Sequence, residues 1–222
     1  MRYATPLRLG LLAGLLLSGC ASQTTQPTQF SGYLADYSQL QPATSATGAP
    51  VLRWISPQFR SERYTSVYVE QPSFYPEPMP SDQVSAQTLE QARDYLHQAL
   101  LRELKDGRLK LVDTPSMDSL VLRSAITGVN VSTEGIKAYE VIPVALVIAA
   151  ASTAAGTRDR DTEIFIELEA LDARTSEPVL RVVRKGHGLT LANSSTQLTL
   201  DDLKPVLDVW ARDARDFQPG LR

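Results

Sequence analysis

Cysteine is almost absent from this sequence of 222 residues, which contains only Cys20. A single cysteine excludes any disulfide within the chain and any metal site built from cysteine thiolates. Histidine, the usual general base and metal ligand, is represented only by His97 and His187. The chain therefore has few of the residue types from which catalytic and metal sites are commonly built.

Basic runs and long apolar segments are absent as well. The 22 Lys and Arg residues are outnumbered by 25 Asp and Glu residues, so the net charge is -3 at pH 7. Without a basic run there is no electrostatic footprint for nucleic acid, and no nucleic-acid partner is expected. No apolar run reaches the ~20 residues of a transmembrane helix. A hydrophobic content of 43% is ordinary for a globular chain with one sizeable core.

The N-terminus reads MRYATPLRLGLLAGLLLSGC. Two arginines, an apolar run over residues 9–17 and two small residues precede Cys20, which is the three-part layout of a secretory signal peptide. Its LLSGC end resembles the bacterial lipobox, in which the leader, here residues 1–19, is removed and the cysteine is lipidated. The alternative is a secreted protein with a free thiol. It is disfavoured because an unpaired cysteine is a liability in an exported protein.

The lipobox resemblance implies a location and a membrane anchor. A lipoprotein cysteine of this type carries three acyl chains, so anchoring at Cys20 is effectively permanent, whereas one chain alone gives marginal binding. Ala21 follows Cys20, in place of the aspartate that retains such proteins at the inner membrane. The analogy therefore implies the periplasmic face of the outer membrane of a Gram-negative bacterium.

The chain after the leader divides by composition into three parts. Residues 20–29 are polar and predict a lipidated cysteine followed by a flexible tether. Residues 30–65 carry Phe30, Tyr33 and Tyr37 and predict an N-terminal arm that packs on the domain, although these aromatic residues could instead bind a partner. Residues 66–222 predict a single α+β periplasmic domain.

Two amphipathic helices and about five strands are expected in that domain. Ser85 caps a helix that Gly107 ends, and a second helix covers residues 199–217. Strand patterns occur in YTSVYVEQP, RLKLVD, SLVLRSAITGVNVST, with an irregularity at Gly128, and the hairpin TEIFIELEALDARTSEPVLRVVRKG. The economical arrangement is an α+β fold, with a mostly antiparallel sheet and both helices on one face.

The stretch VIPVALVIAAASTAAGT predicts a short apolar helix inserted between strands. From Val141 to Gly156 it is too short to span a bilayer, for which ~20 residues are needed. Pro143 suits the first turn of a helix and Gly156 the position just past its end, so a helix over residues 143–155 is expected. An apolar helix must be covered, either by its own sheet or by another subunit.

The candidate catalytic residues are few, and each has a structural alternative. His97 lies on the first helix and His187 in KGHGLT, with neither a local carboxylate nor a nucleophile. Structural or solvated histidines are therefore expected. Gly186 and Gly188 beside His187 predict a bend in the strand.

Two acidic patterns complete the search for chemistry. The RDRD run at residues 158–161 could form a carboxylate metal site, but its alternating charges favour a solvated loop. Glu167 and Glu169 share one strand face at a spacing that suits a paired acid and base, whereas Ile164, Ile166 and Leu168 are expected to be buried. A solvent-facing strand face is the favoured interpretation of the glutamates. No catalytic residue, cofactor or metal is expected, and the protein is not expected to be an enzyme.

Several sequence blocks together resemble a lipoprotein family of Gram-negative bacteria known as DUF3313, a domain of unknown function. They are the lipobox, SGYLADYSQLQP, LRWISPQFRSERYTSVYVEQPSFYPEP, IELEALDARTSEPVLRVVRKG and the C-terminal helix with Trp210. The resemblance covers nearly all of the chain after the leader. It implies no activity and no functional residue beyond Cys20.

Three hypotheses for function follow. The first is a non-catalytic interaction or assembly domain in the cell envelope, anchored by Cys20, whose partner is another envelope protein or a second copy meeting the stretch from Val141 to Gly156. The second is a subunit of a ring-forming secretion or export accessory complex in which that stretch lines or enters a membrane. The third is a periplasmic hydrolase or ligand-binding protein centred on His187 and nearby acids.

Overall fold

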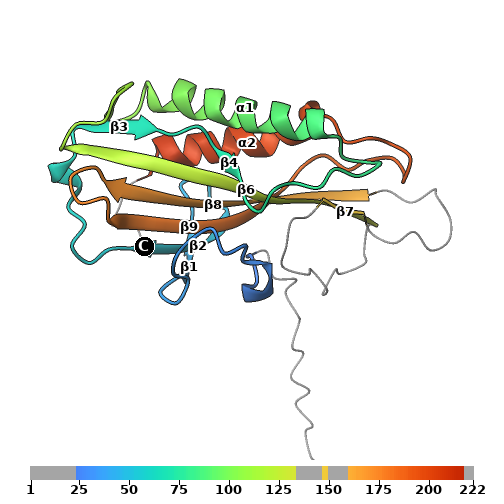
Figure 1. Cartoon of the computed structure of the whole chain (residues 1–222), viewed down its shortest axis with the longest axis horizontal. Helices are drawn as coiled ribbons and strands as arrows, with labels where there is room; N and C mark the ends of the chain where they lie inside the picture. Colours follow the sequence, from blue (N-terminus) through green and yellow to red (C-terminus); the bar gives the residue numbers. More distant parts are fainter. Residues whose placement is uncertain (1–23, 134–146, 150–159, 218–222) are drawn as a thin grey trace, which may run out of the picture.

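The computed structural model describes residues 24–133, 147–149 and 160–217. This part of the chain forms two layers, a twisted β-sheet and two helices that lie side by side along one face of it (Figure 1). The helices are α1 (Ala86–Leu104) and α2 (Leu200–Arg215). The expected α+β class and the placing of both helices on one face are confirmed. The leader and Cys20 lie outside the described residues.

The sheet has nine strands in the described part of the chain, in the order β1-β2-β9-β8-β6-β3-β5, with β4 and β7 also paired to β6. Their bounds are β1 (Gln41–Thr44), β2 (Pro50–Ile55), β3 (Ser66–Val69), β4 (Ser73–Phe74), β5 (Lys110–Leu111), β6 (Ser119–Thr133), β7 (Val147–Ala149), β8 (Arg160–Asp172) and β9 (Pro178–His187). Neighbouring strands in the spatial series β1-β2-β9-β8-β6 pair antiparallel. In contrast, β3, β4 and β7 pair parallel with β6, and β5 pairs parallel with β3.

The expectation of about five mostly antiparallel strands is therefore corrected to a mixed sheet of nine described strands. The parallel pairing of β3 with β6 has a physical cause in the connection between them. Helix α1 lies between these strands in sequence, and a crossover of helical length returns the chain to the end of the sheet from which it started. The irregularity expected at Gly128 is confirmed, because the β6–β8 register shifts between Ile126 and Gly128.

The helix predicted over residues 143–155 is wrong at three residues. Val147–Ala149 form β7, which pairs parallel with Val129, Asn130 and Val131 of β6, rather than a helix. A short apolar run rich in Val and Ile suits a buried strand as well as a helix, and periodicity alone does not separate the two. The remainder of the predicted helix lies outside the described residues.

The helix predictions are confirmed by their caps and buried faces. The Ser85 side chain accepts a hydrogen bond from the Thr88 backbone at 3.0 Å, as expected of an N-cap. The apolar face of α1 is buried and includes Leu89, Ala92, Leu96, Leu100 and Leu104. On α2, Leu203, Leu207 and Trp210 are buried against the sheet and α1. No helix in the described ranges is long and apolar enough to cross a bilayer.

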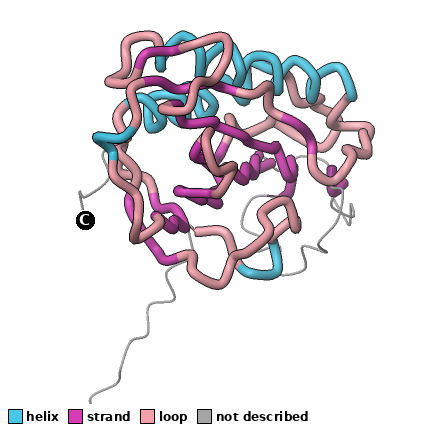
Figure 2. Tube along the Cα trace, turned by 60° about the vertical axis from the view of Figure 1, so that its left-hand side comes forward, coloured by secondary structure: helices cyan, strands magenta, loops and turns pink. Residues whose placement is uncertain are grey.

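Residues 24–65, which precede β3, are part of the folded domain. Thr25, in the segment expected to be a tether, is 3% exposed and is followed by a 3-10 turn, η1 (Pro27–Gln29). The expected arm, residues 30–65, contributes β1, β2 and a second turn, η2 (Ser61–Arg63). The segment before β1 lies against the side of the sheet away from the helices (Figures 1 and 2).

Gly186 and Gly188 allow α2 to approach the end of β9 closely. Neither residue has a positive φ, so the backbone itself does not require glycine there. A Cβ at Gly186 would lie 3.1 Å from Trp210 Cζ2 and closer still to Val206 Cγ2. A Cβ at Gly188 would lie 2.7 Å from the Asp202 carbonyl oxygen. The glycines are needed for contact between helix and strand.

Replacing Gly186 with alanine should therefore destabilise the protein. We expect Gly186→Ala to lower the free energy of unfolding by about 1–3 kcal/mol, the usual cost of overpacking, as measured by urea denaturation. Val206→Ala removes the nearest obstacle, so the double variant should be more stable than the sum of the two single effects predicts. If the effects of the two substitutions were simply additive, the contact with Val206 would not be the cause of the destabilisation.

Candidate functional site

The carboxylate of Glu167 on β8 is enclosed by the N-terminal segment. Its side chain is fully buried, at 0% exposure. Oε1 accepts a hydrogen bond from the Ser31 backbone at 2.8 Å, and Oε2 accepts one from the Tyr37 hydroxyl at 2.5 Å. The Leu34 backbone N–H lies 3.4 Å from Oε2 and completes the set. Glu167 thus binds the chain's own SGYLADY segment.

Local geometry explains why this segment can surround a carboxylate. Gly32 adopts φ +91°, a left-handed conformation that favours glycine, so consecutive backbone N–H groups turn inward. The Tyr37 hydroxyl accepts hydrogen bonds from the Gly32 and Leu34 backbones at 2.8 and 3.1 Å while it donates to Glu167. Phe30 stacks on the Tyr37 ring with centroids 4.6 Å apart. The turn is therefore organised around the Tyr37 side chain.

The environment of Tyr37 alters its ionisation. Burial, and then the hydrogen bond to Glu167, raises the pKa of Tyr37 to about 12. Removing the phenolic proton would place a second negative charge against the enclosed carboxylate, without the hydrogen bond that joins them. The neutral phenol is therefore part of the structure at all physiological pH values.

The solvent-facing interpretation of the glutamates is wrong for Glu167. Phe165, on the same strand face, is also buried at 6% exposure. Glu169 is half-buried and pairs with Arg123 at 3.4 Å, so its carboxylate is not part of the enclosure around Glu167. The two carboxylates that a paired acid and base would need thus have two separate structural roles. The sequence signal for this enclosure is a charged residue within an apolar strand together with a glycine- and tyrosine-containing turn elsewhere.

The histidines lie in separate parts of the structure. His97 is on α1, half-buried, and its Nε2 has no hydrogen-bond partner among the described residues. His187 is exposed at the end of β9, opposite Glu163 in the strand register. The Glu163 carboxylate is held by Lys185 at 3.1 Å and by Asn130 at 3.4 Å. No hydrogen bond joins either histidine to a carboxylate in the described ranges.

The RDRD run is not wholly a solvated loop. Arg160 and Asp161 begin β8, and the Arg160 backbone pairs with Leu191. The Arg160 side chain is buried at 6% exposure. The first two residues of the run lie outside the described residues. Across residues 24–133, 147–149 and 160–217, no group of three or more His, Cys, Asp or Glu side chains could hold a metal ion.

A cavity of about 160 Å³ lies between the helices and the sheet. Leu96 and Leu100 of α1, Trp210 of α2, and Ile166 and Leu168 of β8 are among the mainly apolar residues that line it. Its charged lining residues are four arginines and one aspartate: Arg53, Arg108, Arg184, Arg215 and Asp213. The cavity is therefore apolar inside and predominantly cationic among its charged groups.

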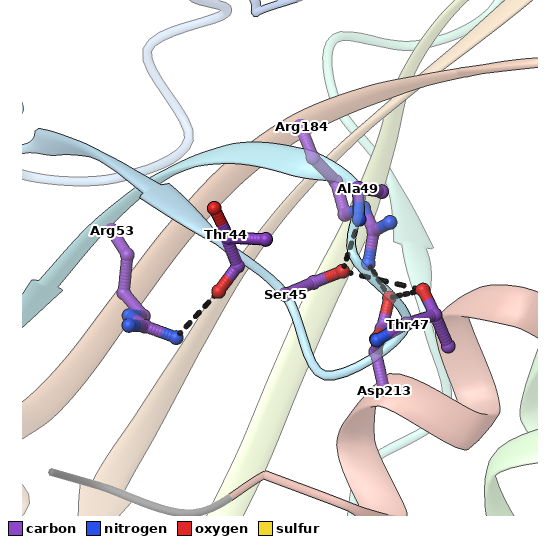
Figure 3. Close-up of polar contacts among 7 residues, drawn as sticks. All are labelled: Thr44, Ser45, Thr47, Ala49, Arg53, Arg184 and Asp213. Atoms are coloured by element: carbon purple, nitrogen blue, oxygen red, sulfur yellow. Dashed lines mark hydrogen bonds and ion pairs between the residues drawn. The ribbon is translucent and has the colours of Figure 1, made fainter. Parts of the chain in front are cut away.

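Two residues that line this cavity, Arg184 and Asp213, form a buried ion pair (Figure 3). Arg184 of β9 donates to Asp213 of α2 at 2.7 Å, and each side chain is 8% exposed. Thr47, in the turn between β1 and β2, donates to Asp213 through its backbone at 2.7 Å and its hydroxyl at 3.1 Å. The Arg184 guanidinium lies 5.4 Å from the centre of the Trp210 ring. These contacts join the sheet, the second helix and the β1–β2 turn.

The sequence was compared with families of known proteins. The family described as protein of unknown function DUF3313 matches residues 29–214. The chain belongs to this family. Two relatives of the chain are the uncharacterized lipoproteins YdcL of Escherichia coli strains K12 and O157:H7, each 44% identical over 218 residues that cover 98% of both chains. The predicted family is confirmed, and the lipoprotein name agrees with the lipobox at Cys20.

Solved structures were compared as well. The PelC dodecamer from Paraburkholderia phytofirmans is 11% identical, with a TM-score of 0.38 over 76% of this chain and 98% of that chain. A DUF4136 family protein from Bacteroides thetaiotaomicron is 10% identical, with a TM-score of 0.34 over 73% of this chain and 91% of that chain. At this level the likeness carries no argument about the activity or assembly of the DUF3313 chain.

Removing the Tyr37 hydroxyl should weaken the docking of the N-terminal segment. We expect Tyr37→Phe to lower the free energy of unfolding at neutral pH by about 1.5–3 kcal/mol, because a hydrogen bond to a charged group is lost. The folded-state pKa of about 12 exceeds the unfolded value of about 10. The stabilisation from Tyr37 is therefore complete below pH 10 and lost as the pH rises through about 12.

Urea denaturation across this pH range tests both statements. The wild-type protein should lose more stability above pH 10 than Tyr37→Phe does. Tyr68→Phe is the matched control, because Tyr68 is half-buried and forms no side-chain hydrogen bond within the described residues. Equal losses in wild type and Tyr37→Phe would contradict the role of the phenol.

Breaking the buried ion pair should be strongly destabilising. We expect Asp213→Ala to lower the free energy of unfolding by about 3–5 kcal/mol, because Arg184 would remain buried without its counter-charge. Replacing both residues by leucine should cost less. The Asp201–Lys204 pair has the same 2.7 Å separation but an aspartate that is 81% exposed. Asp201→Ala should leave stability nearly unchanged, and an equal loss in both single variants would refute the dependence on burial.

Proposed function

We propose that this DUF3313 protein is a lipoprotein anchored at the periplasmic face of the outer membrane, where it acts by binding another component of the envelope and not by catalysis. The lipobox at Cys20, the alanine that follows it and the lipoprotein relatives support the location. The candidate acidic side chains already form contacts within the protein, and this supports the non-catalytic role.

The observation that carries the proposal is the fixed attachment of the N-terminal segment to the sheet. Three residues separate Cys20 from Thr24, the first described residue, and Thr25 is already buried. A chain extends at most ~3.6 Å per residue, so these four steps span no more than about 14 Å. With the segment held by Glu167, a lipid on Cys20 keeps the folded domain close to the bilayer surface.

The same contacts favour binding over catalysis. Glu167 is enclosed by backbone and phenol donors, Asp213 is neutralised by Arg184, and Glu163 is held by Lys185. A general base needs a lone pair within reach of a substrate, and these carboxylates already accept hydrogen bonds within the protein. Binding partners would instead meet the surface of the domain, and the apolar stretch from Val141 to Gly156 is the candidate contact that the sequence suggests.

Fractionation of the envelope tests the location. Wild-type protein is expected in the outer-membrane fraction, and Cys20→Ala in the soluble fraction with unchanged far-ultraviolet circular dichroism. Ala21→Asp keeps the lipid but introduces the residue associated with retention at the inner membrane, so this variant should move to the inner-membrane fraction. Membrane association of Cys20→Ala equal to that of wild type would refute lipid anchoring.

Complementation of a deletion strain, with Cys20→Ala and two further variants, separates binding from catalysis. If the protein acts by binding at the membrane, His187→Ala and Glu169→Gln should reverse the envelope defect of the deletion strain, whereas Cys20→Ala should not. Loss of complementation by a folded, correctly located His187→Ala variant would support the hydrolase hypothesis instead.

A further inference from the structure

The cavity between the helices and the sheet has the dimensions of a binding site for an alkyl chain. A cavity of about 150 Å³ accommodates a six-carbon ring, so one of about 160 Å³ holds a hydrocarbon segment of similar size. Leu96, Leu100 and Ile166 present hydrocarbon to any such segment.

The charged lining residues differ in how far they are already neutralised. Arg184 is paired with Asp213 at 2.7 Å, and Arg215 is bonded to Glu103 at 2.6 Å and to Asp216 at 2.8 Å. These two arginines are therefore not available to bind an external anion without losing an internal partner.

Arg53 and Arg108 remain available. Arg53 donates to the Thr44 carbonyl at 3.4 Å and lies over the Phe217 ring, 5.7 Å from its centre. Arg108 donates to the Ser61 carbonyl at 3.4 Å. Within the described residues neither guanidinium has a carboxylate within 4.0 Å. Each therefore has several free N–H donors beside an apolar cavity.

We propose that this cavity binds a single-chain anionic amphiphile, with its alkyl chain among the apolar lining residues and its carboxylate or phosphate at one of the two available arginines, Arg53 or Arg108. The inference rests on the proposal that the domain acts by binding and specifies the ligand class. A guanidinium matches the geometry of carboxylate and phosphate oxygens, and hydrogen bonds to these groups are strengthened by charge. Alcohols and alkyl ammonium ions of the same chain length lack the negative charge that either arginine would recognise.

Isothermal titration calorimetry with defined probes tests the ligand class. The full mature chain carrying Cys20→Ala is used, because its own acyl chains and detergent would otherwise compete. Decanoate and decyl phosphate, below their critical micelle concentrations, should bind at least about tenfold more tightly than decanol, and decyltrimethylammonium should bind least. From hexanoate to decanoate, affinity should rise about fourfold per CH₂ until the cavity is filled.

Variants separate the headgroup site from the chain site. Arg53→Gln/Arg108→Gln should reduce decanoate affinity to that of decanol and leave decanol binding unchanged. Arg63→Gln is the matched control, since Arg63 is exposed, forms no ion pair among the described residues and does not line the cavity. Ala46 is an exposed lining residue, so Ala46→Trp should block entry and abolish binding of every probe while the melting temperature stays unchanged.

Each outcome decides one part of the proposal. Tighter binding of decanoate or of decyl phosphate identifies a carboxylate or a phosphate as the preferred headgroup. Equal affinities for decanol and both anions would overturn the assignment of Arg53 and Arg108, and no binding by any probe would overturn the site. Mislocalisation of the lipidated protein would defeat the proposed function without affecting this test, which uses unlipidated protein.

Discussion

The enclosed carboxylate of Glu167 is the interaction on which the arrangement of the N-terminal part of the chain depends. An ionisable group with no exposure to water is tolerated only when hydrogen bonds replace its lost hydration. Among the described residues, all of its hydrogen-bond donors come from the segment between Ser31 and Tyr37. Docking of that segment and burial of the carboxylate are therefore mutually dependent. Without the segment, β8 would expose this face, and without the carboxylate, the inward-turned N–H groups would lose their acceptor.

The Arg184–Asp213 pair has a comparable role on the helix side of the sheet. A buried ion pair adds little net stability compared with apolar residues of similar volume, but losing either member leaves an uncompensated charge. Asp213 also accepts both hydrogen bonds from Thr47. The pair therefore fixes the position of α2 relative to β9 and to the β1–β2 turn. Arg184 and Asp213 both line the cavity, so this junction forms part of the cavity wall.

Sequence patterns predicted the elements whose determinants are local. Helix α1 is specified by the Ser85 cap and the spacing of its leucines, and the β8–β9 hairpin by apolar runs on either side of a turn. The strands β1 and β2 were missed because Pro42 and Pro50 interrupt any strand pattern, although proline is compatible with an edge strand or with its first residue. Parallel pairing around β6 was missed because it depends on the three-dimensional crossover through α1.

The site was less accessible to sequence analysis for a related reason. Alternation along β8 distinguishes two faces but does not reveal what covers the second one. The cover of Glu167 comes from Ser31, 136 residues away in the sequence. The packing role of Gly186 is also set by a distant contact, because the helix that approaches it follows later in the chain. In both cases the determining contact is made with a residue distant in the sequence. The periodicity of a single sequence contains no information about such contacts.

Strand β8 is the physical link between the two sides of the molecule. Successive side chains of a strand point to opposite faces, so Ile166 and Leu168 line the cavity while Glu167, between them, holds the N-terminal segment. The strand is paired along its length with β6 and β9, and it cannot shift on one face alone. A substitution that moves Ile166 or Leu168 therefore displaces the acceptor of Ser31 and Tyr37. Effects on ligand binding and on docking of the N-terminal segment must be separated with residues outside this strand, such as Arg53 and Arg108 for the cavity and Tyr37 for the segment.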